Sequence, residues 1–218
     1  MNLCYRTGKL LANVFMRTFG SIEIRGVENI PSSGGFIVTA NHLSTLDPPL
    51  LTVALNRTLF FLGKKELFVN RIVAYILRSV HVYPVSRSAR DANAVRWAIS
   101  LLEEAKVLCL FPEGARGDGV LMKGEVGAAY IAVKCNVKIL PVGITGTNNL
   151  NSFLRVFFPF RKIKISIGLP YVLPEQKTTI SRVALEEMTS QLMRKIAALL
   201  PTQYHGIYSP DEVKAERE

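Results

Sequence analysis

The protein has 218 residues, of which 49% are hydrophobic and 20% are charged. This composition suffices for one compact core and excludes an intrinsically disordered chain, a coiled coil and a collagen-like repeat. The 27 basic residues exceed the 17 acidic residues and give a formal net charge of +10. A field of that sign attracts phosphate, which makes nucleic acid, anionic lipid and phosphorylated metabolites the partners to consider.

The cysteines and the hydropathy pattern restrict the cellular context. Cys4, Cys109 and Cys135 are too few and too scattered for a disulfide framework or a zinc site, which favours a reducing compartment. No segment approaches the roughly 20 uncharged apolar residues that a transmembrane helix needs. We therefore expect no membrane-spanning helix.

Residues 1–20 contain three basic residues and no acidic residue. Near-helical spacing predicts a basic amphipathic helix, which either packs on the core or lies on anionic lipid. The apolar positions are Leu3, Leu10, Leu11, Val14 and Phe15.

From Ser21 onward, strand-like and helix-like segments alternate. The predicted strands are 22–25, 36–40, 59–62, 80–85, 107–111, 139–144 and 163–167. The predicted helices are 48–55 with Asp47 as its cap, 66–77, 89–104, about 125–135, and 181–200. This alternation predicts an α/β fold with a mixed, mostly parallel sheet flanked by helices, whose loops after the strands share one ligand-binding edge. We assign an N-terminal helix to 1–20, the α/β domain to 21–200 and a flexible tail to 201–218.

A histidine and an aspartate follow the buried strand 36–40. His42 and Asp47 would lie about 140° apart on a continuous helix, where they could not pair. They can pair if His42 lies in the turn and Asp47 opens the next helix, as Pro48 suggests. The carboxylate then orients one ring nitrogen and leaves the other basic, as in part of a catalytic triad. A structural histidine and an ordinary N-cap aspartate are the commoner alternative for an isolated pair.

Two further segments suit an anion. In the segment 111–119, which follows a strand, three glycines allow the backbone to approach a ligand and Arg116 offers a planar fork for phosphate. This is not a Walker loop, because the lysine and the Ser/Thr are absent. Lys64 and Lys65 lie between a strand and a helix start, where anions bind. The alternatives are a generic turn with a solvated arginine and ordinary exposed lysines.

These segments, together with the strand 139–146, resemble the glycerophospholipid acyltransferase family in their order and spacing. That family is marked by a histidine, four residues and an aspartate, then a Gly-Lys-Glu-type block, Phe-Pro-Glu-Gly-Thr-Arg, and a Val-Pro-Val-type strand. The resemblance extends from about Ser21 to Gly168. Ala115 replaces the usual threonine and Gly117 replaces a frequent serine, and neither change removes a charged group.

The resemblance implies acylation of lysophosphatidate by acyl-CoA or acyl-acyl carrier protein, with no metal and no permanently bound cofactor. His42 would be the general base on the acceptor hydroxyl, and Asp47 would hold its tautomer. The hydroxyl attacks the thioester directly, so the neighbouring Ser44 is not needed as a nucleophile. The implied substrate-binding residues are Arg116 with Lys64 or Lys65 on the acceptor phosphate, Glu113 and Gly114 shaping the loop, and Arg87 and Lys123 as weaker candidates.

Two alternatives to this function differ in the acceptor or in the class of protein. The acceptor could be another lysophospholipid or glycerol 3-phosphate. A non-catalytic module that binds phosphate or nucleic acid would explain the charge but gives no role to His42 and Asp47. The chain also lacks the interleaved aromatic and basic residues typical of nucleic-acid binding, so we expect no nucleic-acid partner.

The substrates implied by the resemblance are amphiphiles, which raises the question of membrane contact. The segment 153–162 contains four phenylalanines and three cations, and it is either a core strand with basic ends or a loop that enters lipid. Basic residues near an anionic leaflet contribute about 1 kcal/mol each. Residues 1–20 and 153–162 therefore predict peripheral attachment to the cytoplasmic face of the cell membrane.

Overall fold

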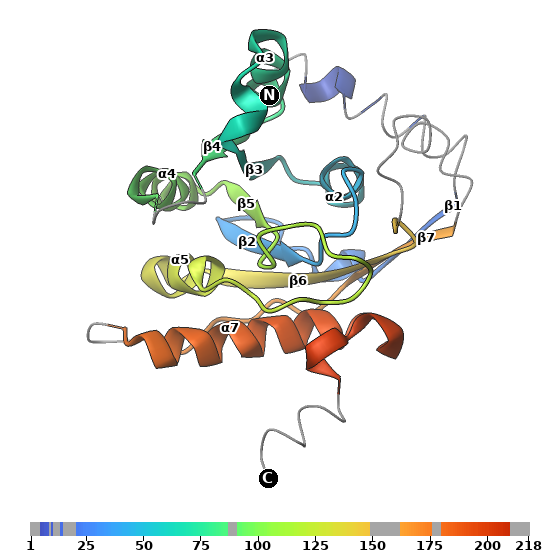
Figure 1. The fold of residues 1–218 in the computed structure, drawn as a ribbon, viewed down its shortest axis with the longest axis vertical. Coiled ribbons are helices and arrows are strands. Elements are labelled where there is room, and N and C mark those ends of the chain that lie inside the picture. Colours follow the sequence, from blue (N-terminus) through green and yellow to red (C-terminus); the bar gives the residue numbers. More distant parts are fainter. Residues whose placement is uncertain are drawn as a thin grey trace.

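A computed structural model of the chain describes residues 5–8, 10, 14, 21–86, 91–148, 162–175 and 180–209. The described strands form one seven-stranded sheet in the order β1-β7-β6-β2-β5-β3-β4, with helices packed around it (Figure 1). Among these strands, β6 and β7 pair antiparallel and the other neighbours pair parallel. The prediction of a mixed, mostly parallel sheet flanked by helices is confirmed.

The elements lie close to their predicted positions. The strands are β1 (Ser21–Arg25), β2 (Phe36–Ala40), β3 (Leu59–Lys64), β4 (Val82–Val85), β5 (Val107–Leu110), β6 (Lys138–Thr145) and β7 (Lys162–Ile167). The helices are α2 (Asp47–Ala54), α3 (Arg71–Ser79), α4 (Ala92–Glu103), α5 (Gly127–Cys135) and α7 (Arg182–Ala197). The described residues also form the short 3₁₀ turns η1 (Val27–Asn29), η2 (Lys65–Phe68), η3 (Thr202–Tyr204) and η4 (Gly206–Tyr208).

The central strand β2 is buried along its whole length because both faces of the sheet are covered. Phe36 and Val38 belong to one apolar cluster, which includes residues of α2 and the inner faces of β6 and β7. Ile37 points to the opposite face, into a second cluster formed with residues of α4, α5 and α7. The alternation of side chains along β2 therefore joins two cores through one sheet.

The single helix predicted for residues 66–77 is wrong. The structure has the 3₁₀ turn η2, a break at Val69–Asn70, and then α3. The Asn70 side chain accepts hydrogen bonds from the backbone N–H groups of Ile72 and Val73, at 2.9 and 3.2 Å. Asn70 is therefore the N-cap at which α3 begins. The apolar pattern of this segment did not reveal that start.

The C-terminal region packs on the core beyond residue 200, where the sequence predicts the start of a flexible tail. Tyr208 is buried, and its hydroxyl accepts a hydrogen bond from the backbone N–H of Gly124 at 3.2 Å. The N–H of Leu121 donates to the carbonyl of Tyr204 at 2.8 Å. Through these contacts, residues 204–208 pack against the loop between β5 and α5.

The two segments predicted to touch membrane fall largely outside the described residues. Within 1–20, residues Tyr5–Gly8 are helical and Tyr5 is buried beside His81, with ring centroids 4.7 Å apart. The remainder of the predicted helix is mostly outside the described residues, as are residues 153–161. Among the helices that the structure describes, none is long and apolar enough to span a bilayer.

Candidate active site

The predicted motifs follow strands whose carboxyl ends lie on one edge of the sheet. β2 lies between β6 and β5, and β3 pairs with the far side of β5. His42 follows β2, the segment 111–119 follows β5, and Lys64 ends β3. Parallel strands are about 4.8 Å apart, so neighbouring loops touch, whereas the ends of β2 and β3 are about 10 Å apart. This edge is where open α/β sheets bind ligands.

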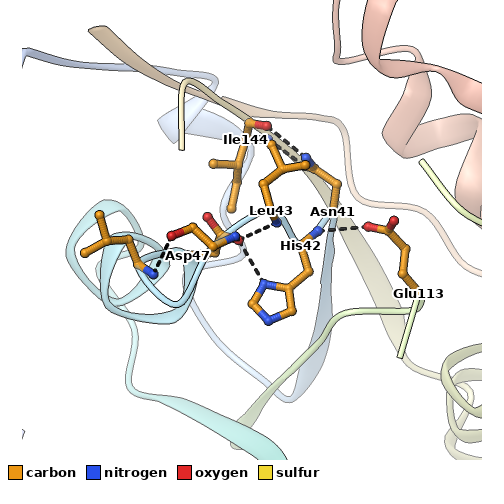
Figure 2. Close-up of polar contacts among 8 residues, drawn as sticks. Asn41, His42, Leu43, Asp47, Glu113 and Ile144 are labelled. Carbon is orange, nitrogen blue, oxygen red and sulfur yellow. Dashed lines mark hydrogen bonds and ion pairs between the residues drawn. The ribbon is translucent and has the colours of Figure 1, made fainter. Parts of the chain in front are cut away.

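His42 and Asp47 form a hydrogen-bonded pair at this edge (Figure 2). Nδ1 of His42 lies 2.8 Å from Oδ2 of Asp47. A carboxylate only accepts hydrogen bonds, so Nδ1 is the donor and Nε2 retains its basic lone pair. The Asp47 side chain is fully buried, whereas that of His42 is 17% exposed. The imidazole is therefore held from the protein side and remains accessible to solvent.

Asp47 does not cap α2 as predicted. Its Oδ2 turns back and accepts hydrogen bonds from the backbone N–H groups of Leu43 and Ser44, both at 2.7 Å. The helix start has no side-chain cap, and Pro48 reduces the need for one because it lacks an N–H. The two backbone bonds fold the turn of residues 43–46 around the carboxylate and fix its position relative to His42.

Glu113 connects the loop after β5 to the loop after β2. Its Oε1 accepts from the backbone N–H of His42 at 2.9 Å, and its Oε2 accepts from that of Met122 at 3.0 Å. Burial raises the pKa of the Glu113 carboxyl, and the two N–H donors act in the opposite direction. With both oxygens engaged by backbone, this side chain holds the loops together. Figure 2 shows its bond to the N–H of His42.

Two further contacts of His42 come from the same loop. The ring of Phe111 stacks on the imidazole, with centroids 4.1 Å apart and planes inclined by 21°. The backbone N–H of Gly117 donates to the carbonyl of His42 at 2.9 Å. Gly114 has a φ of +67°, a conformation that favours glycine, and it turns the loop back toward β2. The orientation of His42 thus depends on a segment about 70 residues away.

Asn41 is a structural residue of the site whose role the sequence motifs do not indicate. Its side chain is buried and bridges to β6: its Nδ2 donates to the carbonyl of Ile144 at 2.8 Å, and its Oδ1 accepts from the N–H of Ile144 at 2.7 Å. These two hydrogen bonds continue the pairing of β2 with β6 past the end of β2. They fix the position of the residue before His42. An asparagine directly after a buried strand is the sequence signal that could have suggested it.

We expect Asn41→Ala to destabilise the fold, because it leaves the buried N–H and C=O of Ile144 without their partners. The expected loss is about 1–3 kcal/mol for each group left unpaired, measured as the free energy of unfolding in urea. Asn93→Ala is the matched control, since Asn93 is exposed on α4. If the two variants lose equal stability, the bridge to Ile144 contributes nothing.

The cationic candidates lie at the rim of this edge. Arg116 and Lys123 are exposed on the loop between β5 and α5, and Lys64 and Lys65 are exposed at the end of β3. Arg87 lies outside the described residues. The loop of Arg116 contacts His42 directly through the bonds described above, whereas the lysines are two strands from it. Arg116 directly precedes Gly117, whose N–H bonds to the carbonyl of His42, so it is the best placed of the described cations for an anion held beside the imidazole.

Other residues with reactive side chains have structural positions. Ser44 is fully buried, and its Oγ accepts from the backbone N–H of Leu46 at 3.2 Å. His81 stacks on the ring of Phe60 and contacts the tilted ring of Tyr5, and burial lowers its pKa. Among the residues that the structure describes, no group of three His, Cys, Asp or Glu side chains converges as metal ligands would.

The site and the sheet agree with comparisons to known proteins. A family model described as acyltransferase matches residues 21–145, which is more than half of the chain. The chain therefore belongs to the acyltransferase family. This membership confirms the resemblance that the four sequence segments indicated.

The relatives within this family point to one kind of acyltransferase. The 1-acyl-sn-glycerol-3-phosphate acyltransferase of Bacillus subtilis is 28% identical over 188 residues, covering 85% of this chain and 92% of that protein. That of Streptococcus pneumoniae is 33% identical over 138 residues, covering 62% and 51%. The crystal structure of the 1-acyl-sn-glycerophosphate acyltransferase of Thermotoga maritima, 29% identical, superimposes with a TM-score of 0.70 over 89% of this chain and 78% of that one.

Proposed function

We propose that the protein transfers an acyl chain from an acyl thioester to the free hydroxyl of 1-acyl-sn-glycerol 3-phosphate, producing phosphatidate for phospholipid synthesis. The observation that supports this most directly is the 2.8 Å bond between His42 and a fully buried Asp47, beside a loop that bears Arg116. The relatives named above act on the same acceptor, by their names.

In the proposed reaction, Nε2 of His42 takes the proton from the acceptor hydroxyl as its oxygen attacks the thioester carbonyl. Collapse of the tetrahedral intermediate breaks the carbon–sulfur bond, and the imidazolium returns the proton to the departing thiolate. Asp47 stabilises the imidazolium through Oδ2 and holds the ring in the reactive tautomer. The substrate supplies the nucleophile, which agrees with the burial of Ser44.

The acceptor phosphate is assigned to Arg116, whose guanidinium can form two parallel bonds to it. Lys64 or Lys65 supplies a further positive charge from the end of β3, and Lys123 and Arg87 are secondary candidates for phosphates of either substrate. Gly114 and Glu113 shape the loop that presents Arg116. Anchoring the phosphate fixes the hydroxyl near His42, which replaces a bimolecular encounter by a positioned one.

Arg116→Ala should raise the KM for the acceptor by about tenfold to a hundredfold, because a charged hydrogen bond to the phosphate contributes about 1.5–3 kcal/mol. The KM for the acyl donor should change much less. Steady-state rates with each substrate varied in turn make this comparison, and Arg96→Ala, an exposed arginine of α4, is the control. A rise confined to the donor KM would instead assign Arg116 to the phosphates of the donor.

The experiment that tests the function is a substrate panel with the purified full chain. Lysophosphatidate, other lysophospholipids and glycerol 3-phosphate are each combined with labelled acyl-CoA or acyl-acyl carrier protein, and the lipid formed is identified by mass spectrometry. Phosphatidate as the main product is the expected result. Preferential acylation of another acceptor would contradict the proposed substrate, and the two donors would be ranked by their rates.

We further propose that the protein acts as a peripheral protein on the cytoplasmic face of the cell membrane. The proposed acceptor and product reside in a bilayer, and the net charge of +10 favours an anionic leaflet. Release of the protein from isolated membranes by high salt, without detergent, is the expected behaviour.

A further inference from the structure

Exposed apolar side chains concentrate on one short segment of the molecule. Among the described residues, fourteen large hydrophobic side chains are exposed, and six of them lie between residues 67 and 76. Their exposed fractions range from 40% to 83%, which is unusual for side chains of this size on one stretch of chain. We call these six residues the α3 surface: Leu67, Val69, Ile72, Val73, Tyr75 and Ile76.

The α3 surface faces away from the core. Of the nine residues of α3, Ala74 is the one that is buried, so the helix rests on the protein by a narrow strip. Ile72, Tyr75 and Ile76 have the spacing that places side chains on one helical face, and that face is open to solvent. In Figure 1, α3 projects beyond β3 and β4 at the end of the molecule farthest from α7. An amphipathic helix normally buries its apolar face, whereas the residues that the structure describes leave this face of α3 uncovered.

The charges around the α3 surface are mostly positive. Lys64, Lys65, Arg71 and Arg78 are exposed there, against one acidic residue, Glu66, between residues 64 and 80. The guanidinium of Arg78 lies 5.8 Å from the centroid of the Phe68 ring. A helix with exposed apolar side chains flanked by arginine and lysine is typical of a segment that lies at a lipid–water interface.

We propose that the α3 surface is a docking site for an anionic phospholipid bilayer. The apolar side chains would enter the acyl boundary while the four cations face lipid phosphates, so both the hydrophobicity and the sign of charge are matched. A projecting helix also suits a flat, fluid surface. A protein partner would not account for the surrounding positive charge unless that partner were itself strongly acidic.

This docking would bring the membrane to the candidate active site. η2 begins directly after β3, at the carboxyl edge where His42 and the loop of Arg116 lie. The advantage of this arrangement rests on the proposed function: an amphiphilic acceptor would pass from the bilayer to the imidazole without crossing water. Binding to lipid itself is independent of any acyl transfer.

The test compares the full-length protein with Ile72→Asp/Ile76→Asp in co-sedimentation with phosphatidylglycerol–phosphatidylcholine vesicles. We expect the double variant to partition at least about tenfold less, because two apolar anchors become charges that an anionic surface repels. The matched control is Leu169→Asp/Val183→Asp, since both residues are exposed apolar side chains outside the α3 surface. Circular dichroism and thermal unfolding establish that each variant remains folded.

A second variant, Arg71→Gln/Arg78→Gln, isolates the electrostatic part. Loss of each charge should lower the affinity for anionic vesicles about fivefold and reduce its dependence on salt, with little effect on phosphatidylcholine vesicles. Unchanged vesicle binding by the folded Ile72→Asp/Ile76→Asp variant overturns the proposal. A variant that dissociates from a dimer to a monomer while vesicle binding persists also overturns it, and assigns the surface to a second copy of the chain.

The two proposals fail separately. Acyl transfer to short-chain, detergent-dispersed lysophosphatidate should be equal in the α3 variants and the native protein, since no residue of the α3 surface is placed in the site. Vesicle binding without acyl transfer by the native protein would reject the proposed function and leave the docking surface intact. Acyl transfer by the native protein, together with vesicle binding that the α3 variants do not change, would support the proposed function and reject the docking surface.

Discussion

His42→Ala is expected to lower kcat for acyl transfer by roughly 10²–10⁴-fold, the typical contribution of a general base. No other side chain is hydrogen-bonded to Asp47 in the described structure, so no second base is positioned to replace it. The fold should survive, because the imidazole is partly exposed and Oδ2 of Asp47 keeps its two bonds to backbone N–H groups. Single-turnover and steady-state rates with saturating substrates measure the loss.

His81→Asn is the matched control for His42→Ala. His81 lies at the opposite end of the sheet, before β4, and has a φ of +63°, which asparagine tolerates better than most residues. We expect kcat of the His81→Asn variant to stay within a factor of about two to three of the native value, because the residue is remote from the site. Native-like turnover by folded His42→Ala would reject His42 as the base and with it the mechanism.

Asp47→Asn is expected to lower kcat by roughly 10³–10⁴-fold with little change in either KM, by analogy with the effect of the orienting carboxylate in catalytic triads. An amide oxygen can still accept from the N–H groups of Leu43 and Ser44, so the turn should persist. The amide lacks the charge that stabilises an imidazolium, and its NH₂ group can select the wrong tautomer of His42. The loss should therefore appear in the chemical step rather than in substrate binding.

Asp91→Asn provides the comparison for this second prediction. Asp91 caps α4 by accepting from the N–H groups of Asn93 and Ala94, both at 3.1 Å, and asparagine is an equally good cap. Its variant should keep full activity. It should lose a little stability, because Oδ2 of Asp91 also accepts from the N–H of Ser86 at 3.0 Å, a bond that the amide NH₂ group cannot make. An Asp47→Asn enzyme with native kcat would show that the carboxylate positions the turn of residues 43–46 and does not assist proton transfer.

Much of the fold followed from short-range patterns. The alternation along 163–167 and the apolar run 36–40 placed β7 and β2 correctly, because burial on one or both faces of a sheet leaves a direct trace in spacing. The pairing of His42 with Asp47 was also predictable, since Pro48 restricts where the helix can begin. The interruption at Asn70 was not, because the same asparagine can occur inside a helix or cap one.

The amino-acid sequence alone therefore indicated most of the elements and the pairing of His42 with Asp47, which depend on residues within a few positions of one another. It also indicated the family, through the order and spacing of four short segments. The tertiary structure decided which distant groups hold that pair. Glu113 and Asn41 meet partners 71 and 103 residues away, and these contacts exist because β5 and β6 flank β2 in the sheet. Strand order also placed α3 at the sheet's end, where the described part of the chain leaves its apolar side chains exposed. The physical reason is that the periodicity of a helix or strand is visible in consecutive residues. Contacts between loops depend instead on the order in which the strands pair.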